Sequence, residues 1–220
     1  MPTTRSSRRS SGRAATRVSG ERSRERILDA AERLLAERGY AAAGIAAISE
    51  ASGLPASSIY WFFESKQDLT AAVVERSADR WMTELTTSAE DGSPDPLGSL
   101  LERAFAQSGG ALPDFLRLAI LLSLELEDPA ILKRLRALRA RGVALIETAL
   151  AELLEVLEEQ GAPAARRLAR RLAPLASAFV EGALVSNELD PGRIEMPRLT
   201  EDIEVAVRAV AAHRLEGGRR

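Results

Sequence analysis

Apolar residues three and four positions apart recur through most of this 220-residue chain, and that spacing predicts a fold made of helices. Glycine, proline and aspartate interrupt the pattern, as at Gly39, Gly109-Gly110 and Asp190-Pro191-Gly192, where helices are expected to end. No segment has the composition expected of a strand. The predicted helices cover about residues 21–38, 45–51, 55–63, 65–86, 96–108, 113–126, 129–159, 163–188 and 197–214. The predicted fold class is therefore all-α, with about nine helices.

Several classes of chemistry find no support in the composition. The chain has no cysteine, which removes disulfides, thiolate metal ligands and cysteine nucleophiles. His213 is the one histidine and lies near the C-terminus, where a surface position is expected rather than a catalytic one. We therefore predict no enzymatic activity, no metal and no cofactor. The longest strongly apolar stretch, residues 116–126, is far shorter than the roughly 20 residues that cross a membrane, so we expect a cytoplasmic protein without a membrane partner.

Positive charge gathers in the first third of the chain. Residues 1–66 contain 11 basic and 7 acidic residues, a formal charge of +4, whereas the rest contains 19 and 25, a formal charge of −6. An anionic partner suits the first part. Residues 1–20 carry arginines, no acid and few large apolar groups, so they are predicted to be disordered alone. A basic arm that follows DNA and a merely solvated tail are equally consistent with this segment.

The segment ASSIYWFFESK, residues 56–66, holds four consecutive aromatic residues in a chain that is 4% aromatic. Two short helices separated by the turn Ser52-Gly53 match the helix-turn-helix plan, in which the second helix enters the major groove of DNA. On that second helix Ile59 and Phe63 are four residues apart and are expected to face the core. Ser57, Tyr60 and Trp61 fall on the opposite side, where they are expected to contact DNA, and Phe62 lies between the two faces.

Three stretches resemble the TetR family of bacterial transcriptional regulators. They are ILDAAERLLAERGY, ISEASGLPASSIYWFF and ESKQDL, and the resemblance runs from about residue 26 to residue 69. It implies a DNA-binding head over residues 21–66, a helical regulatory and dimerisation domain over 67–216 and a flexible tail over 217–220. Beyond the head, only the number and length of the helices agree with the family.

The resemblance also implies which residues meet DNA. The recognition helix opens at Pro55, and Lys66 stands where the family usually places a phosphate-binding lysine at the first turn of the fourth helix. Ala43 and Gly44 depart from the family because hydroxyl residues are common there, so a phosphate contact and a stronger cap are expected to be missing. Pro55 replaces the serine that is frequent in the family at this turn, and proline is acceptable at a first helical position. The predicted DNA-binding residues are Gly44, Pro55, Ala56, Ser57, Ser58, Tyr60, Trp61 and Lys66.

The last two predicted helices are rich in small residues, which favours close helix packing between two subunits or within one. We interpret them as a homodimer interface, since a two-fold operator requires a two-fold protein. The predicted interface comprises Ala173, Ala176, Ser177, Val180, Ala183, Leu184, Ile203, Ala206, Val207 and Val210. A pocket for an apolar effector is predicted among the earlier helices, lined by Trp81, Met82, Phe105, Gln107, Phe115, Leu118, Leu122, Arg141, Leu145 and Phe179.

These expectations combine into a ligand-responsive repressor. The predicted partners are a double-stranded DNA operator, a second copy of the chain and a small effector whose binding releases the DNA. Repression rather than activation is implied by the resemblance. The alternative is a helical protein-interaction scaffold without sequence-specific DNA binding, because helical bundles commonly bind partner helices.

Overall fold

The structure, a computed structural model, describes residues 7–87, 95–108, 112–157, 162–192 and 195–217. Within these ranges the chain forms nine helices and no strand, which confirms the predicted all-α fold. The helices are α1 (Ser7–Ala42), α2 (Ile45–Ser52), α3 (Ala56–Phe62), α4 (Lys66–Thr87), α5 (Pro96–Ser108), α6 (Asp114–Glu125), α7 (Pro129–Leu157), α8 (Ala162–Leu189) and α9 (Met196–Gly217). None of the helices in the described ranges is both long and apolar enough to cross a bilayer.

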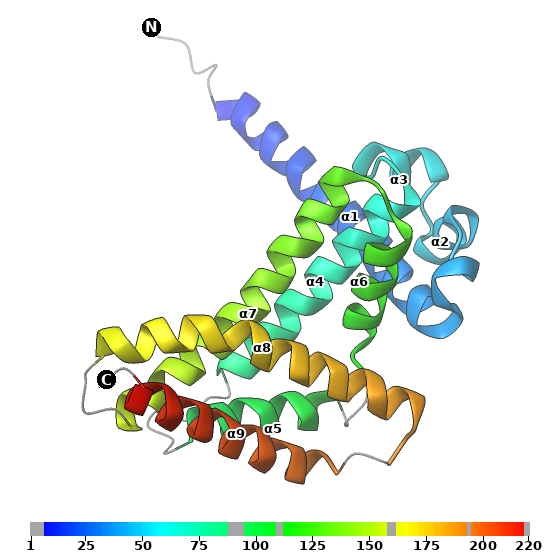
Figure 1. Cartoon of the computed structure of the whole chain (residues 1–220). Coiled ribbons are helices and arrows are strands. Elements are labelled where there is room, and N and C mark those ends of the chain that lie inside the picture. The colour runs from blue at the N-terminus through cyan, green and yellow to red at the C-terminus, as the bar shows by residue number, and fades with distance from the viewer. Residues whose placement is uncertain (1–6, 88–94, 109–111, 158–161, 193–194, 218–220) are drawn as a thin grey trace, which may run out of the picture.

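The helices form a head and a body joined by long shared helices (Figure 1). Helices α2 and α3 lie at one end with the middle of α1, and α5, α8 and α9 lie together at the other end. Helices α4, α6 and α7 run between the two ends. A change of packing in the body can therefore reach the head through helices that belong to both.

Helix α1 begins at Ser7, well before the start predicted at residue 21. The predicted disordered arm over residues 1–20 is thus helical from Ser7 onward, and residues 1–6 lie outside the described ranges. The sequence there contains alanine and arginine, which are good helix formers, and extending an existing helix avoids the cost of nucleating a new one. The predicted stop at Gly39 is confirmed, because this residue has φ of 73° and ψ of 172°, which are not helical values, and so interrupts α1.

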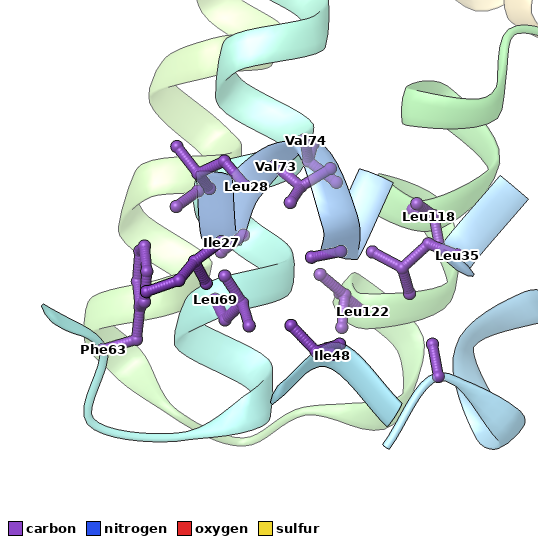
Figure 2. Close-up of a cluster of buried hydrophobic side chains, with 14 of the residues drawn as sticks. Ile27, Leu28, Leu35, Ile48, Phe63, Leu69, Val73, Val74, Leu118 and Leu122 are labelled. Carbon is purple, nitrogen blue, oxygen red and sulfur yellow. The ribbon is translucent and has the colours of Figure 1, made fainter. Parts of the chain in front are cut away.

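Two clusters of buried apolar side chains hold the molecule together. The first joins α1, α2, α3, α4, α6 and the beginning of α7, and Figure 2 shows Ile27, Ile48, Leu69 and Leu122 meeting from four of these helices. The second lies in the body, among α5, α7, α8, α9 and the end of α4. Trp81 packs against both clusters. The core of the head therefore continues past residue 66 into the body instead of closing on itself.

Ion pairs fasten α1 to one side of α4. Arg76 on α4 donates to Glu25 and Asp29 on α1, each at 2.8 Å, and to Glu32 at 2.7 Å. Burial alone would raise the pKa of Glu32, but hydrogen bonds from Ser77, Arg80 and Arg76 hold that pKa below its usual value.

Further ion pairs fasten α7 to α4. Arg134 on α7 donates to Asp68 at 2.5 Å and to both carboxylate oxygens of Glu75 at 2.8 and 2.7 Å. The hydrogen bonds with Glu75 are the main reason that the pKa of Arg134 is raised. Arg141, one of the predicted pocket residues, instead donates to Asp79 on α4 at 2.5 Å and is exposed. Helix α4 is thus bonded to both the head and the body.

Candidate nucleic-acid interface

The turn between α2 and α3 is fixed by a left-handed glycine and by bonds from α1. Gly53 caps α2 with φ of 64°, and its N–H donates to carbonyl groups at the end of that helix. Ser49 Oγ donates to the carbonyl of Leu54 at 2.7 Å, and Arg26 on α1 donates to the carbonyl of Ser52 at 2.6 Å. A Cβ at position 53 would lie 3.1 Å from the Arg26 guanidinium. Glycine is therefore favoured both by the backbone conformation and by the close approach of Arg26.

Helix α3 has two distinct faces. Ile59 is 0% exposed and Phe63, which caps the helix, is 3% exposed, whereas Tyr60 is 57% and Trp61 is 73% exposed. Phe62 is half-buried, and its ring meets the Trp61 ring edge-on with centroids 4.5 Å apart. The predicted division into a buried and an open face is confirmed. Phe62, whose role the sequence left open, packs against the core and contacts the Trp61 ring.

The first residues of α2 and α3 lack side-chain caps. Gly44 is the N-cap of α2 with no capping hydrogen bond from a side chain, as the sequence predicted. Pro55 is the N-cap of α3, with Ala56 first in the helix, so the prediction that Pro55 opens the helix is one residue early. The ψ of Pro55 is 151°, an extended value, while its φ of −62° is the one that the proline ring imposes. Ser57 is exposed, and Ala56 and Ser58 are partly exposed beside it.

Lys66 joins the start of α4 to the end of α1. Its Nζ donates to the carbonyl of Tyr40 at 2.5 Å and to that of Ala41 at 3.3 Å, and lies 4.3 Å from the centre of the Tyr40 ring. Burial lowers the pKa of Lys66 below its usual value. The sequence predicted an exposed phosphate ligand and missed these contacts, because Tyr40 lies 26 positions away along the chain. In the free protein this ammonium stabilises the carbonyl end of α1, a favourable position for a cation.

The start of α4 carries the predicted side-chain cap. The N–H of Asp68 donates to Ser65 Oγ at 3.0 Å, and the Asp68 carboxylate accepts from the N–H of Glu64 at 3.0 Å. These reciprocal bonds resemble a capping box and fix the chain between α3 and α4. Since Asp68 also accepts from Arg134, the exit from the recognition helix is bonded to the body.

A cavity of about 330 Å³ lies in the body between α4, α5, α6, α7 and α8. Of the predicted pocket residues, Trp81, Met82, Phe115 and Leu145 line it. Five others lie elsewhere: Phe105, Leu118 and Leu122 are buried in the core, and Gln107 and Phe179 are exposed. Arg141 does not line it either, as its bond to Asp79 already indicates. The cavity walls also include residues that the sequence did not suggest, among them Leu101, Ile120, Arg139, Ile146 and Glu181.

The residues predicted for the dimer interface divide between the inside and the outside of the subunit. Most are buried in this single chain, namely Ala173, Ala176, Ser177, Ala183, Leu184, Ile203 and Val207. Val180, Ser177 and Leu184 line the cavity. Ala206 and Val210 on α9 are exposed. The predicted α8 residues thus lie on the face of that helix that meets the subunit's own core. Their spacing could not show this, because small apolar residues occur on both sides of the helix.

The outer face of α8 is nevertheless apolar. Leu175, Phe179 and Leu189 are 62%, 59% and 80% exposed, and their positions lie along one side of the helix. On α9, Val205 is 65% and Val210 is 38% exposed, but these residues are five positions apart and lie on different sides of that helix. We therefore call only Leu175, Phe179 and Leu189 the outer α8 face. Large apolar groups gathered on one exposed side of a helix are a usual mark of an interaction surface.

Comparison with known proteins adds to this geometry. Residues 27–73, which include α2, α3 and parts of α1 and α4, match the model of bacterial regulatory proteins of the tetR family. The HTH-type transcriptional regulator TtgR from Pseudomonas putida is 31% identical over 85 residues, which cover 39% of this chain and 40% of that relative. The chain thus matches well under half of the relative's length.

Solved structures share most of the arrangement of helices at low sequence identity. The transcriptional regulator FadR from Bacillus subtilis in complex with stearoyl-CoA superposes with a TM-score of 0.57 at 16% identity, covering 83% of this chain and 96% of that one. A candidate transcriptional regulator from Saccharomonospora viridis in complex with choline gives a TM-score of 0.59 at 21% identity, covering 86% and 96%. These likenesses establish the fold.

Proposed function

We propose that this chain, whose residues 27–73 identify it with the TetR family, is a transcriptional repressor that binds a two-fold operator as a homodimer and is released by a small effector. The observation that carries the proposal is the open face of α3. Tyr60 and Trp61 stand exposed on the second helix of a helix-turn-helix while Ile59 anchors that helix in the core. Both rings leave most of their surface exposed, although Trp61 also contacts Phe62, and large exposed rings on so short a helix suit a helix that enters a groove.

The chemistry of α3 favours contacts with the DNA backbone and with groove shape. Tyr60 offers a hydroxyl to a phosphate, and Trp61 offers an indole N–H and an apolar edge for sugar or a thymine methyl. Ser57 adds a short hydroxyl on the same side. None of α3's residues can make the bidentate contact of arginine with guanine, so we infer that water, small contacts and DNA deformability contribute much of the sequence preference. Gly44 and Pro55 approach the DNA through the backbone at the starts of α2 and α3.

Lys66 contributes to this interface from the edge. Its ammonium is shared by two carbonyl oxygens at the end of α1, and a phosphate oxygen would be a stronger, charge-assisted acceptor. We infer that Lys66 contacts a phosphate when DNA is bound, and that it holds α1 and α4 together when DNA is absent.

The outer α8 face supports the homodimer. Leu175, Phe179 and Leu189 would pack against the same residues of a second copy, since a two-fold interface brings one patch against itself. A dimer would also place two recognition helices about one DNA turn apart, or about 34 Å.

The cavity supports a small effector. Its walls are mostly apolar, and its volume of about 330 Å³ lies at the lower end of the range for small-molecule sites. Solved structures of the same fold hold stearoyl-CoA and choline. Trp81 and Met82 place α4 in the cavity wall, and the same helix begins beside the recognition helix. An effector that prefers one position of α4 would shift the heads toward a spacing that no longer fits the operator.

Binding to duplex DNA tests this function directly. Sequences selected from a random duplex pool by the purified protein would be titrated at several salt concentrations and followed by fluorescence anisotropy. Affinity should fall steeply as salt rises, because phosphate contacts release counterions. Tyr60→Ala should weaken binding about tenfold or more, the loss expected for hydrogen bonding and stacking contacts of this kind.

Arg166→Ala serves as the control. It changes an exposed residue near the N-terminal end of α8 and should bind DNA as the unmodified protein does. All variants should retain the same helix content by circular dichroism. Equal DNA affinity in Tyr60→Ala and Arg166→Ala would contradict the assignment of α3 to the DNA interface. Failure to select any sequence would favour the helical scaffold instead.

A further inference from the structure

Glu181 on α8 places a carboxylate in the wall of an otherwise apolar cavity. Among the described residues that line this cavity, Arg139 and Glu181 are the charged ones, and most of the remainder are leucine, isoleucine, alanine or aromatic. Acidic residues are almost never placed beside apolar surface without a partner. The partners of Glu181 therefore indicate what else this carboxylate can bind.

Both oxygens of the Glu181 carboxylate have a donor. Ser177, one turn earlier on α8, donates its hydroxyl to one oxygen at 2.8 Å. Arg139 on α7 donates to the other oxygen at 2.9 Å. Ser177 is only 5% exposed and lines the cavity beside Glu181. The serine thus fixes the carboxylate from within the subunit, and the arginine neutralises it across the gap between two helices.

Arg139 and Glu181 differ in how readily each side chain can move out of the ion pair. The side chain of Arg139 is 55% exposed and that of Glu181 is 30% exposed. Arg139 can turn into water at little cost, because an ion pair with so exposed a partner contributes little stability. Glu181 would remain in the wall, held by Ser177, and would then need another cation because a half-buried carboxylate is poorly solvated.

We propose that the cavity selects an amphipathic cation, a molecule with an apolar body and an amine that replaces Arg139 at the Glu181 carboxylate. This inference rests on one part of the proposed function, namely that the cavity binds an effector. The apolar body fills the space beside Trp81, Phe115 and Leu145, and the ammonium donates to the Glu181 oxygen that Arg139 leaves. An anionic molecule is disfavoured, because it would meet the Glu181 carboxylate in the same wall.

Three probes with one apolar chain and different heads test the preference. Decylammonium, decanol and decanoate differ in head charge while their decyl chains are the same. The chain contains two tryptophans, Trp61 and Trp81, so the Trp61→Phe variant leaves the indole in the cavity wall as the sole reporter. Each probe is titrated below its micelle concentration at pH 7 and followed by tryptophan emission and by calorimetry.

Decylammonium should bind on the order of tenfold more tightly than decanol, because its ammonium makes a hydrogen bond to a charged group. In Glu181→Gln, which keeps an oxygen for the Ser177 hydroxyl, the affinity for decylammonium should fall toward that for decanol. In Arg139→Gln, which frees the carboxylate, the affinity for decylammonium should rise. A circular dichroism melt of each variant shows that it is folded.

The remaining outcomes separate this inference from the proposed function. Decanol or decanoate binding as tightly as decylammonium would overturn the preference for a cation and would leave the cavity as an effector site. An unchanged preference in Glu181→Gln would remove Glu181 from recognition. No binding of any of the three probes would overturn both the inference and the effector site, whereas DNA binding would still stand on its own measurements.

Discussion

The two faces of α3 can be separated by neighbouring substitutions at positions 59 and 60. Ile59 is 0% exposed and belongs to the cluster that contains Ile27, Phe63 and Leu69, so Ile59→Ala removes three buried carbon atoms from a packed core. Such a change costs about 2–5 kcal/mol, because a lost apolar contact and a residual cavity add. Tyr60 is 57% exposed, and Tyr60→Ala should change the free energy of unfolding by no more than about 0.5 kcal/mol.

Urea denaturation followed by far-ultraviolet circular dichroism measures both values. The protein concentration must be the same in every experiment, since the stability of a dimer depends on it. We expect Ile59→Ala to lower the midpoint with little change in slope and Tyr60→Ala to leave the midpoint in place. Under conditions in which both variants are folded, DNA affinity should fall more in Tyr60→Ala than in Ile59→Ala. Equal losses of stability in the two variants would refute the assignment of one residue to the core and the other to the surface.

Three further predictions concern other parts of the molecule. Lys66→Ala should lower DNA affinity and reduce the slope of log K against log salt by about one, because one phosphate contact is lost, and Arg166→Ala should do neither. An unchanged slope would show that Lys66 acts only by holding the end of α1. Phe179→Glu should shift sedimentation toward the monomer, because it places a charge in the outer α8 face, while Leu124→Glu, at an exposed position of α6, should sediment as the unmodified protein does. A dimer that persists in Phe179→Glu would move the interface elsewhere. The lowered pKa of Glu32 contributes stability that is fully present above its ordinary value of 4.5 and is lost as the pH falls through the lower folded value. In Glu32→Gln the thermal melting temperature should therefore fall less as the pH is lowered below about 4.5. An equally steep fall in this variant and in the unmodified protein would show that Glu32 is not the source of the pH dependence.

Helix α4 connects the two proposed sites, the DNA-binding head and the cavity. It carries Lys66 and the capping residue Asp68 at the head, Arg76 in contact with α1, and Trp81 in the cavity wall. Arg134 bonds the head end of α4 to α7, whose later turns also line the cavity. Ligand-dependent repacking of the cavity would therefore act on a helix that is hydrogen-bonded to Glu64, in the segment that follows α3.

The sequence by itself determined the features that depend on near neighbours along the chain. The ends of most helices, the glycine at the α2–α3 turn and the opposite faces of Ile59 and Tyr60 follow from local spacing and from residue conformation. The cap at Ser65 belongs to the same group, since its two partners are three residues apart. These features need no knowledge of how the helices pack, because a helix fixes the relative directions of residues only a few positions apart.

Only the tertiary structure decided how those faces are used. The apolar residues of α8 surround much of the helix, so position in the fold alone set Ser177 and Leu184 inward and Phe179 outward. The contact of Lys66 with Tyr40 and the pairing of Glu181 with Arg139 join residues from separate helices. Their meeting depends on the angle and distance at which whole helices pack, and these follow from the complete core, not from the pattern within any one segment.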